Sequence, residues 1–223
     1  MKPHFVENWE LGVPQTLAVF GTSLSFYLAP MLARELENRF GAVAQVANFG
    51  LSATASITAL SRLDAVIEAA PHGVLMEFAV NDAHSFYHDE TAFDAGISLQ
   101  ESRENLETLV LRLQKSLPCC EIWLQTTNGA WDSPRGVESL GTANCATHRP
   151  QLNAYFETVR AVARARGLQI VDNWNVWHAL QHADFAHFAQ LVPDGIHPSP
   201  RGIRELWIPQ ILRAWNIEQS GQT

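Results

Sequence analysis

Five short apolar runs, separated by longer segments with helical spacing, constrain the fold of this chain more than any other feature. The runs cover residues 17–20, 42–49, 74–80, 121–127 and 168–172. A short apolar run bounded by turn residues is typical of a strand that is buried on both faces. Parallel strands need long crossover connections, and the intervening helical segments supply them. We therefore predict an α/β fold in which helices cover both faces of a five-stranded parallel sheet.

Capping signals indicate where the intervening helices begin and end. The predicted helices span residues 26–40, 52–70, 98–117 and 151–166, and a final helix starts at Ser199 or Pro200. Ser52 or Thr54 can cap the second helix, and Ser98-Leu-Gln-Glu101 has the capping-box pattern. The stretch between residues 173 and 191 is rich in Trp and His and is predicted to be irregular.

Length and charge narrow the class of protein. The chain has 223 residues and no composition shift that marks a linker, so residues 1–223 are expected to form a single domain. Its 15 Lys and Arg residues against 23 Asp and Glu residues give a net charge of −8. Because that charge repels phosphate backbones, neither nucleic acid nor an anionic membrane is expected as a partner.

The apolar residues are distributed as in a protein without a membrane anchor. Residues 1–11 contain no apolar core of signal-peptide length, and no apolar run reaches the roughly 18 residues of a transmembrane helix. The chain is therefore expected to be cytoplasmic, without membrane insertion, unless a leader was removed. Its three cysteines, of which Cys119 and Cys120 are adjacent, form no disulfide framework and are expected to be reduced thiols.

The first apolar run ends in a turn that carries a serine. Gly21 permits a sharp change of direction, and Ser23 then lies between the carboxyl end of a strand and the amino end of a helix. In that position the hydroxyl is exposed, and the free N–H groups of the first helical turn can hold developing negative charge. Catalytic serines and helix-capping serines both use this geometry, so the turn alone favours neither.

A second candidate feature is Asp194-Gly-Ile-His197, close to the carboxyl terminus. The spacing lets the Asp194 carboxylate accept a hydrogen bond from Nδ1 of His197, which leaves Nε2 free to take a proton. A serine hydroxyl is a weak nucleophile until such a base removes its proton. The alternative interpretation is a local pair that caps the final helix.

Two further residues follow the carboxyl ends of predicted strands, as Ser23 does. Gly50 ends the second strand and Asn81 follows the third, so the three turns should converge on one edge of the sheet. An acyl-transfer site needs donors aimed at an oxyanion, and the N–H groups of Ser23 and Gly50 with the amide of Asn81 are the candidates. Gly50 can also be an ordinary turn residue, and Asn81-Asp82 a helix cap.

Taken together, these features resemble the SGNH hydrolases, the lipase and esterase family also called GDSL. The resemblance spans nearly the whole chain and rests on four blocks: Gly21-Thr-Ser-Leu24, Asn48-Phe-Gly50, Ala79-Val-Asn-Asp82 and Asp194-Gly-Ile-His197-Pro. It implies a flavodoxin-like three-layer α/β/α fold and no metal or organic cofactor.

The resemblance also implies roles for the residues in these blocks. Ser23 would be the nucleophile, His197 the base and Asp194 its orienting partner, while Ser23, Gly50 and Asn81 would form the oxyanion hole. The chain departs from the family pattern at Thr22, where Asp is usual, and at Ala79, where Gly is usual. Neither position carries the attacking group or the base, so the departures bear on the subfamily and its substrate.

Aromatic residues near the predicted site suggest the substrate. Trp131 follows the fourth strand, and Trp174 and Trp177 follow the fifth, so all three are predicted on the site face. Aromatic faces can cover sugar C–H groups or apolar acyl chains, although Trp is as often a core residue. We expect the substrate to be a short acyl ester. The resemblance to this family implies, more narrowly, an O-acetyl ester of a carbohydrate. A thioesterase or lysophospholipase-type substrate and a non-catalytic small-ligand binder are the alternatives.

Other chemistries find weaker support in the sequence. His84 and His88 stand four residues apart, and His178, His182 and His187 form a later cluster, but no His-Glu-x-x-His motif accompanies them. These histidines are predicted to be solvated or capping residues rather than metal ligands. Cys120 and Cys145 lack an adjacent histidine pattern and are predicted to be inert thiols.

Overall fold

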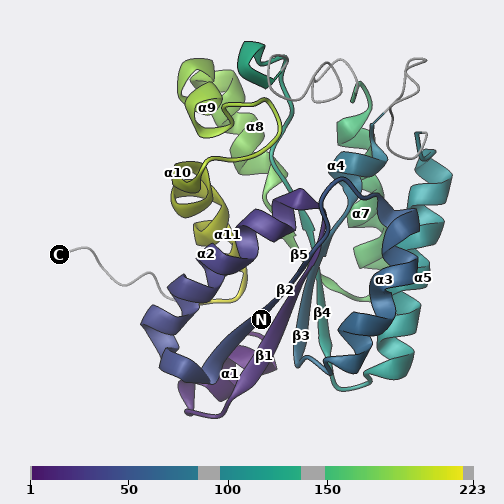
Figure 1. The fold of residues 1–223 in the computed structure, drawn as a ribbon, viewed down its shortest axis with the longest axis vertical. Helices are drawn as coiled ribbons and strands as arrows, with labels where there is room; N and C mark the ends of the chain where they lie inside the picture. Colours follow the sequence, from purple (N-terminus) through teal and green to yellow (C-terminus); the bar gives the residue numbers. More distant parts are fainter. Residues whose placement is uncertain (1, 85–95, 137–148, 218–223) are drawn as a thin grey trace.

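The computed structural model describes residues 2–84, 96–136 and 149–217 (Figure 1). Its five strands form one parallel sheet in the order β2-β1-β3-β4-β5. The strands are β1 (Gln15–Gly21), β2 (Ala44–Gly50), β3 (Gly73–Glu77), β4 (Glu121–Thr126) and β5 (Gln169–Asp172). The predicted five-stranded parallel sheet with helices on both faces is confirmed.

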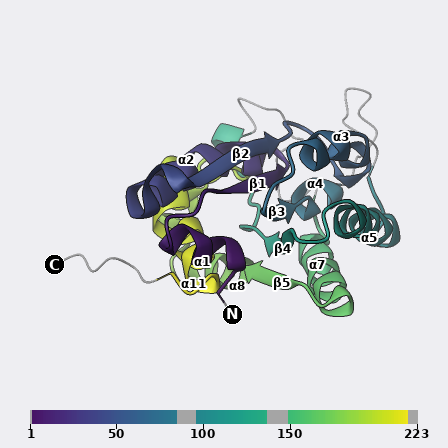
Figure 2. The ribbon, with the colours of Figure 1, turned by 90° about the horizontal axis from the view of Figure 1, so that it is seen from below.

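Two layers of helices enclose the sheet. One layer contains α1 (His4–Glu10), α2 (Ser23–Phe40) and α11 (Ile208–Ala214), and the other contains α3 (Ser56–Glu68), α5 (Leu99–Ser116) and α7 (Leu152–Arg166). Figure 2 shows the two layers on opposite sides of the strands. The shorter elements are η1 (Gly41–Val43), α4 (Ala79–Asp82), α8 (Trp174–Ala183), α9 (Phe185–Leu191), α10 (Pro200–Gly202) and the one-turn π-helix η4 (Ile203–Trp207).

Most of the predicted helix ends are confirmed. Ser98 and Glu101 form the reciprocal capping box of α5, and Gly167 ends α7 in the left-handed region at φ 64°. Ser199 caps α10, and Pro200 occupies its first position. The predicted cap of α3 was wrong, because neither Ser52 nor Thr54 caps the helix. Instead, the Asp82 side chain of α4 accepts a hydrogen bond from the Ser56 N–H group at the start of α3.

Two predicted segments differ from the structure. The third strand ends at Glu77, and residues 79–82 form the helical turn α4 instead of continuing the strand. The Trp- and His-rich stretch is helical rather than irregular, since α8 and α9 occupy most of it. Apolar side chains explain the second difference, because Trp177 and Phe188 are completely buried against the core.

The register of the sheet determines where the site lies. Gly21, the last residue of β1, is paired with Gly50 of β2 on one side and with Glu77 of β3 on the other. Three strands therefore end at the same level, and the turns that follow them lie side by side. In Figure 1 this edge is the upper one, where α4, α8 and α9 gather.

Candidate active site

Three side chains form a chain of hydrogen bonds at the carboxyl edge of the sheet. Ser23 Oγ lies 2.9 Å from His197 Nε2, and His197 Nδ1 lies 2.7 Å from Asp194 Oδ2. The histidine and aspartate side chains are about 20% exposed, at 21% and 20%. The structure thus brings together three residues that the sequence places in two distant turns, with the imidazole between the hydroxyl and the carboxylate.

The Asp194 carboxylate is held in its ionised form. Burial opposes its charge, but the hydrogen bond from His197, the charge of that ring and two backbone N–H groups together hold the pKa of Asp194 below its ordinary value. Those backbone groups belong to Ile196 and His197, which donate to Oδ1 at 3.0 and 2.7 Å. With Oδ1 occupied by the backbone, Oδ2 is oriented toward the imidazole.

The loop after β4 supports the loop that carries Asp194 and His197. The Trp131 indole N–H donates to the Val192 carbonyl at 2.6 Å, and the Trp131 backbone N–H donates to the Gly195 carbonyl at 3.0 Å. Asn128 Nδ2 donates to the Ile196 carbonyl at 2.7 Å. The polar groups of Trp131, a predicted substrate residue, are therefore engaged with the backbone of this loop.

Gly136 shows how closely the two loops approach each other. A Cβ atom at this position would lie 2.0 Å from the carbonyl oxygen of Asp194. Backbone atoms cannot yield as a flexible side chain can, so any larger residue at position 136 would displace the Asp194 loop. No local pattern in the sequence marks this glycine, because its requirement arises from a contact with a residue 58 positions further along the chain.

Gly50 is required by packing against α2. A Cβ atom at Gly50 would lie 2.1 Å from the backbone nitrogen of Phe26, so the residue must be glycine for α2 to cross β2 here. Its N–H group donates to Asn48 Oδ1 at 2.9 Å, and Asn48 Nδ2 donates to the Phe26 carbonyl at 3.1 Å. The close approach of α2 therefore requires glycine at this position, and the role of Gly50 in an oxyanion hole stays a prediction.

Asn81 lies in α4, which follows β3, the strand whose end is paired with the end of β1. Its Nδ2 donates to the Thr54 carbonyl at 2.8 Å, which uses one of the two amide hydrogens. The next residue, Asp82, is buried and anchors the turn: it accepts from the Ser56 N–H at 2.8 Å and from the Ser102 hydroxyl at 2.6 Å. The same contact to Ser56 starts α3 in place of the predicted cap.

The predicted aromatic residues have different surroundings, and one further aromatic residue lies beside His197. Trp177 is completely buried and does not face the site. Trp174 packs against Phe156 and His178, with ring centroids 5.1 and 4.8 Å away. Tyr27, which the sequence analysis did not select, meets the His197 ring edge-on at 5.5 Å and is 49% exposed.

Tyr27 could have been found from its position four residues after Ser23. Residues four apart on a helix lie on the same face, so a helix that presents Ser23 also presents Tyr27. Beside it, Phe26 is 46% exposed, and the two rings meet edge-on at 5.6 Å. An exposed aromatic pair thus borders the Ser23–His197 contact.

The histidines and cysteines that the sequence offers as alternatives to a serine site have the following surroundings in the structure. Among residues 2–84, 96–136 and 149–217, no group of three or more His, Cys, Asp or Glu side chains is arranged to hold a metal ion. His178 and His182 approach each other, Nε2 to Nε2, at 2.9 Å on the exposed face of α8. His88 and Cys145 lie outside the described residues. Burial raises the pKa of the Cys120 thiol to about 12, as expected of an inert thiol.

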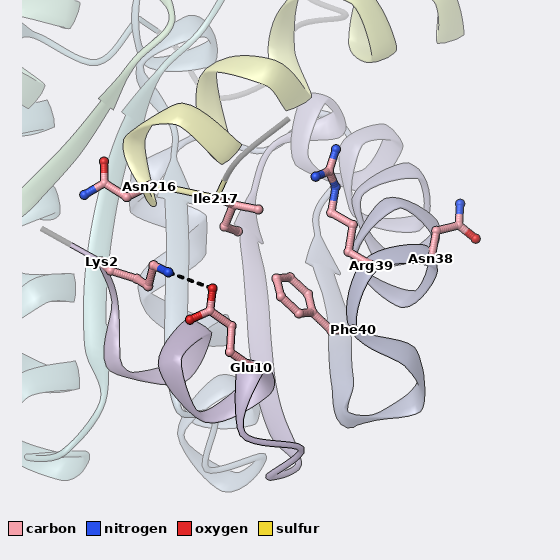
Figure 3. Close-up of a pocket in the computed structure, with 7 residues that line it drawn as sticks. All are labelled: Lys2, Glu10, Asn38, Arg39, Phe40, Asn216 and Ile217. Carbon is pink, nitrogen blue, oxygen red and sulfur yellow. Dashed lines mark hydrogen bonds and ion pairs between the residues drawn. The ribbon is translucent and has the colours of Figure 1, made fainter. Parts of the chain in front are cut away.

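A pocket of about 500 Å³ lies far from Ser23 (Figure 3). Phe40 and Ile217 line it together with the Lys2–Glu10 ion pair, whose nitrogen and oxygen are 2.6 Å apart. Phe40 ends α2, the helix that begins at Ser23, and 18 residues of helix span about 27 Å. The pocket therefore lies at the opposite end of the sheet and takes no part in the candidate site.

In the parts of the chain that the structure covers, no helix is long and apolar enough to cross a bilayer.

A protein-family model and several solved structures are similar to this chain. Residues 15–204 match the model of the GDSL-like Lipase/Acylhydrolase family. No curated protein matches the chain. A lipase/acylhydrolase from Enterococcus faecalis has a similar structure, with a TM-score of 0.68 and 23% identity, covering 94% of this chain and 100% of that one.

Two further solved structures resemble the chain. LAE5, an alpha/beta hydrolase enzyme from the metagenome of Lake Arreo, Spain, has a TM-score of 0.71 and 21% identity over 93% of this chain and 98% of its own. Axe2, an acetylxylan esterase from Geobacillus stearothermophilus, has a TM-score of 0.71 and 20% identity over 94% of this chain and 99% of its own. At these identities the likeness establishes the fold.

Proposed function

Because the chain belongs to the GDSL-like lipase/acylhydrolase family and is a carboxylic ester hydrolase, we propose that Ser23, His197 and Asp194 form its catalytic triad. We further propose that it hydrolyses short-chain acyl esters, in particular O-acetyl esters of carbohydrates. The observation that carries the proposal is the hydrogen-bonded series from Ser23 Oγ through His197 to Asp194, with separations of 2.9 and 2.7 Å.

The reaction follows from these contacts. Ser23 Oγ attacks the ester carbonyl carbon, and its proton passes to His197 Nε2, while the Asp194 carboxylate stabilises the imidazolium. Collapse of the tetrahedral intermediate breaks the bond to the alcohol, which leaves with that proton. A water molecule then gives a proton to Nε2 and attacks the acyl-Ser23 ester. The carboxylic acid is released, and the proton returns to Ser23.

The oxyanion needs donors that do not already have partners. The Ser23 N–H group has no acceptor among the described residues, and one Asn81 amide hydrogen remains after the bond to Thr54. The Gly50 N–H group donates to Asn48 Oδ1, so it can serve the oxyanion only if that side chain moves. Ser23 and Asn81 are therefore the main donors in this proposal, and Gly50 is a conditional third.

The proposed alcohol part of the substrate is a carbohydrate. Exposed Tyr27, next to His197, offers a ring face of the kind that covers sugar C–H groups. Trp131 and Phe185 form a second aromatic pair near the Asp194 loop, with ring centroids 5.4 Å apart. The acetylxylan esterase activity of the similarly folded Axe2 supports an acetylated sugar as the first substrate to test.

Labelling with a fluorophosphonate tests the nucleophile directly. Intact-mass analysis should detect one adduct, and peptide mapping should locate it on Ser23. Ser23→Ala should lose both the adduct and ester turnover, whereas Ser61→Ala, which alters an exposed serine on α3, should lose neither. Turnover that survives in Ser23→Ala would refute the assignment.

A longer acyl chain is the second candidate substrate, and one observation favours it. A pocket of about 390 Å³ beside the site is lined in part by Phe20, Phe49 and Leu51. Leu51 donates its N–H to the Gly21 carbonyl at 2.7 Å, so this pocket borders the Ser23 turn. Rates for p-nitrophenyl esters from acetyl to palmitoyl, with acyl thioesters beside them, discriminate the two. A maximum at long chains would favour a thioesterase or lysophospholipase-type enzyme.

A further inference from the structure

Glu77 is a buried carboxyl group directly beneath the turn that carries Ser23. It ends β3, and only 2% of the residue is exposed. Its Oε1 accepts three hydrogen bonds from the residues on either side of Ser23. The donors are the Thr22 N–H at 2.7 Å, the Thr22 hydroxyl at 2.8 Å and the Ser25 hydroxyl at 2.9 Å.

No cation explains why a carboxyl group is buried at this position. Among the described residues, Glu77 forms no ion pair, and its second oxygen, Oε2, is buried without a hydrogen-bond partner. Burial raises the pKa of Glu77 to about 7, opposed by the hydrogen bonds from Thr22 and Ser25. Burying a polar group with an unpartnered oxygen is destabilising. The three hydrogen bonds to the turn are the interactions that a carboxyl group provides at this position.

These bonds act on the residues that orient Ser23. Thr22 caps α2: its hydroxyl donates to Glu77 and accepts from the Leu24 N–H at 3.2 Å. Ser25 is completely buried, one residue beyond Leu24. One carboxyl oxygen therefore holds residues on both sides of Ser23. The Ser23 hydroxyl is directed to His197, and the Ser23 N–H group has no acceptor within the helix.

Glycine at position 21 allows the Glu77 carboxyl group to lie this close to β1. A Cβ atom at Gly21 would lie 2.5 Å from Glu77 Oε1 and 2.3 Å from Ser25 Oγ. The strand that leads into the Ser23 turn therefore passes directly over the carboxyl group, and no water-sized space separates them.

We infer that Glu77 is a positioning residue for the nucleophile: it fixes the Thr22–Ser25 turn by accepting hydrogen bonds through Oε1. The inference rests on the proposed function of Ser23. Glu77 does not touch the substrate, and its effect passes through Thr22 and Ser25. Loss of the acceptor should let the turn relax, and a displacement of about 1 Å at a nucleophile can lower a rate by about 100-fold.

The test compares Glu77→Ala with Glu77→Gln, using Leu75→Ala as the matched control. Glutamine keeps an oxygen acceptor for the three donors, whereas alanine removes it. Leu75 is completely buried on the same strand, so its truncation destabilises the core without removing a bond to the turn. All assays are run below the unfolding transition of each variant.

Glu77→Ala should lower kcat by about 100-fold with KM changed less than about twofold, and fluorophosphonate labelling of Ser23 should slow in parallel. Glu77→Gln should restore kcat to within about fivefold of the wild type, and Leu75→Ala should retain wild-type kcat. An unchanged kcat in Glu77→Ala, or an equal loss in Glu77→Gln, would overturn the inference.

If Glu77→Ala does not fold, the double variant Thr22→Val with Ser25→Ala gives the same answer. It removes both hydroxyl donors and leaves Glu77 in place, so a lower kcat is expected and a wild-type kcat would overturn the inference. Activity of Ser23→Ala is measured separately. If Ser23→Ala is active the proposed function fails, whereas if it is inactive while Glu77→Ala is fully active only the inference fails.

Discussion

Replacing Glu77 by glutamine is expected to change how the stability of this protein depends on pH. The Glu77 carboxyl titrates at its ordinary value of 4.5 in the unfolded chain and at about 7 in the folded protein, because burial disfavours its charge. Between these values the folded state binds more protons than the unfolded state. The stability that Glu77 contributes is therefore fully present below pH 4.5 and is lost as the pH rises to about 7.

The size of the effect follows from the pKa difference. A shift from 4.5 to about 7 corresponds, at 1.36 kcal/mol per pKa unit, to about 3 kcal/mol in the free energy of unfolding. Glutamine has no proton to exchange, so the Glu77→Gln variant should lack this contribution. The difference in stability between wild type and variant should change by about 3 kcal/mol between pH 4.5 and pH 8 and be constant above that range.

Urea unfolding at half-unit pH intervals measures this difference. Two other carboxyls also have shifted pKa values: burial raises the pKa of Asp82, and the contacts with His197 and the backbone lower the pKa of Asp194. Both are present in the two proteins, so their contributions cancel in the subtraction. Glu68→Gln, at an exposed position on α3, is the control for removing one carboxyl. Parallel stability curves for wild type and Glu77→Gln over the whole range would refute the reasoning.

Three further predictions concern activity. Gly136→Ala should lower kcat by about 100-fold, because the added Cβ would lie 2.0 Å from the Asp194 carbonyl and displace that loop; steady-state kinetics and Ser23 labelling rates check it. Asn81→Ala should lower kcat by about 100-fold or more with little change in KM, as expected of a donor to the oxyanion; an effect on KM alone would contradict this role. Tyr27→Ala should raise KM for acetylated sugars about fivefold and leave p-nitrophenyl acetate nearly unaffected, and equal effects on both would argue against a sugar platform.

Much of the fold was predictable because local patterns and tertiary packing agree. The apolar runs and the crossover segments between them predict a parallel sheet, and the capping box at Ser98 predicts where α5 begins. The prediction failed where local and tertiary signals diverge. Residues 173–191 look irregular in sequence, yet burial of Trp177 and Phe188 makes helices of them.

The residues of the candidate site were predictable from the sequence, whereas the contacts that hold them in place were not. Ser23, Asn81 and the Asp194–His197 pair each lie in a turn with a recognisable local pattern, and the parallel topology predicts that these turns meet. Their catalytic roles remain predictions. The packing requirement at Gly50 was not predictable from its own turn, since the atom that excludes a Cβ belongs to Phe26 of α2.

The sequence by itself indicated the family, the sheet and the residues that we propose for acyl transfer, because each depends on short-range spacing and on the order of strands. Only the tertiary structure decided what holds those residues in place. In the sequence, Glu77 lies inside a predicted strand, Gly136 follows the fourth predicted strand, and Tyr27 is one aromatic residue of a predicted helix. Their significance comes from contacts between segments 50 or more residues apart for Glu77 and Gly136, and from the ring of His197 for Tyr27. The contacts of Glu77 and Gly136 leave no local pattern, since any residue of suitable size and polarity satisfies the local backbone.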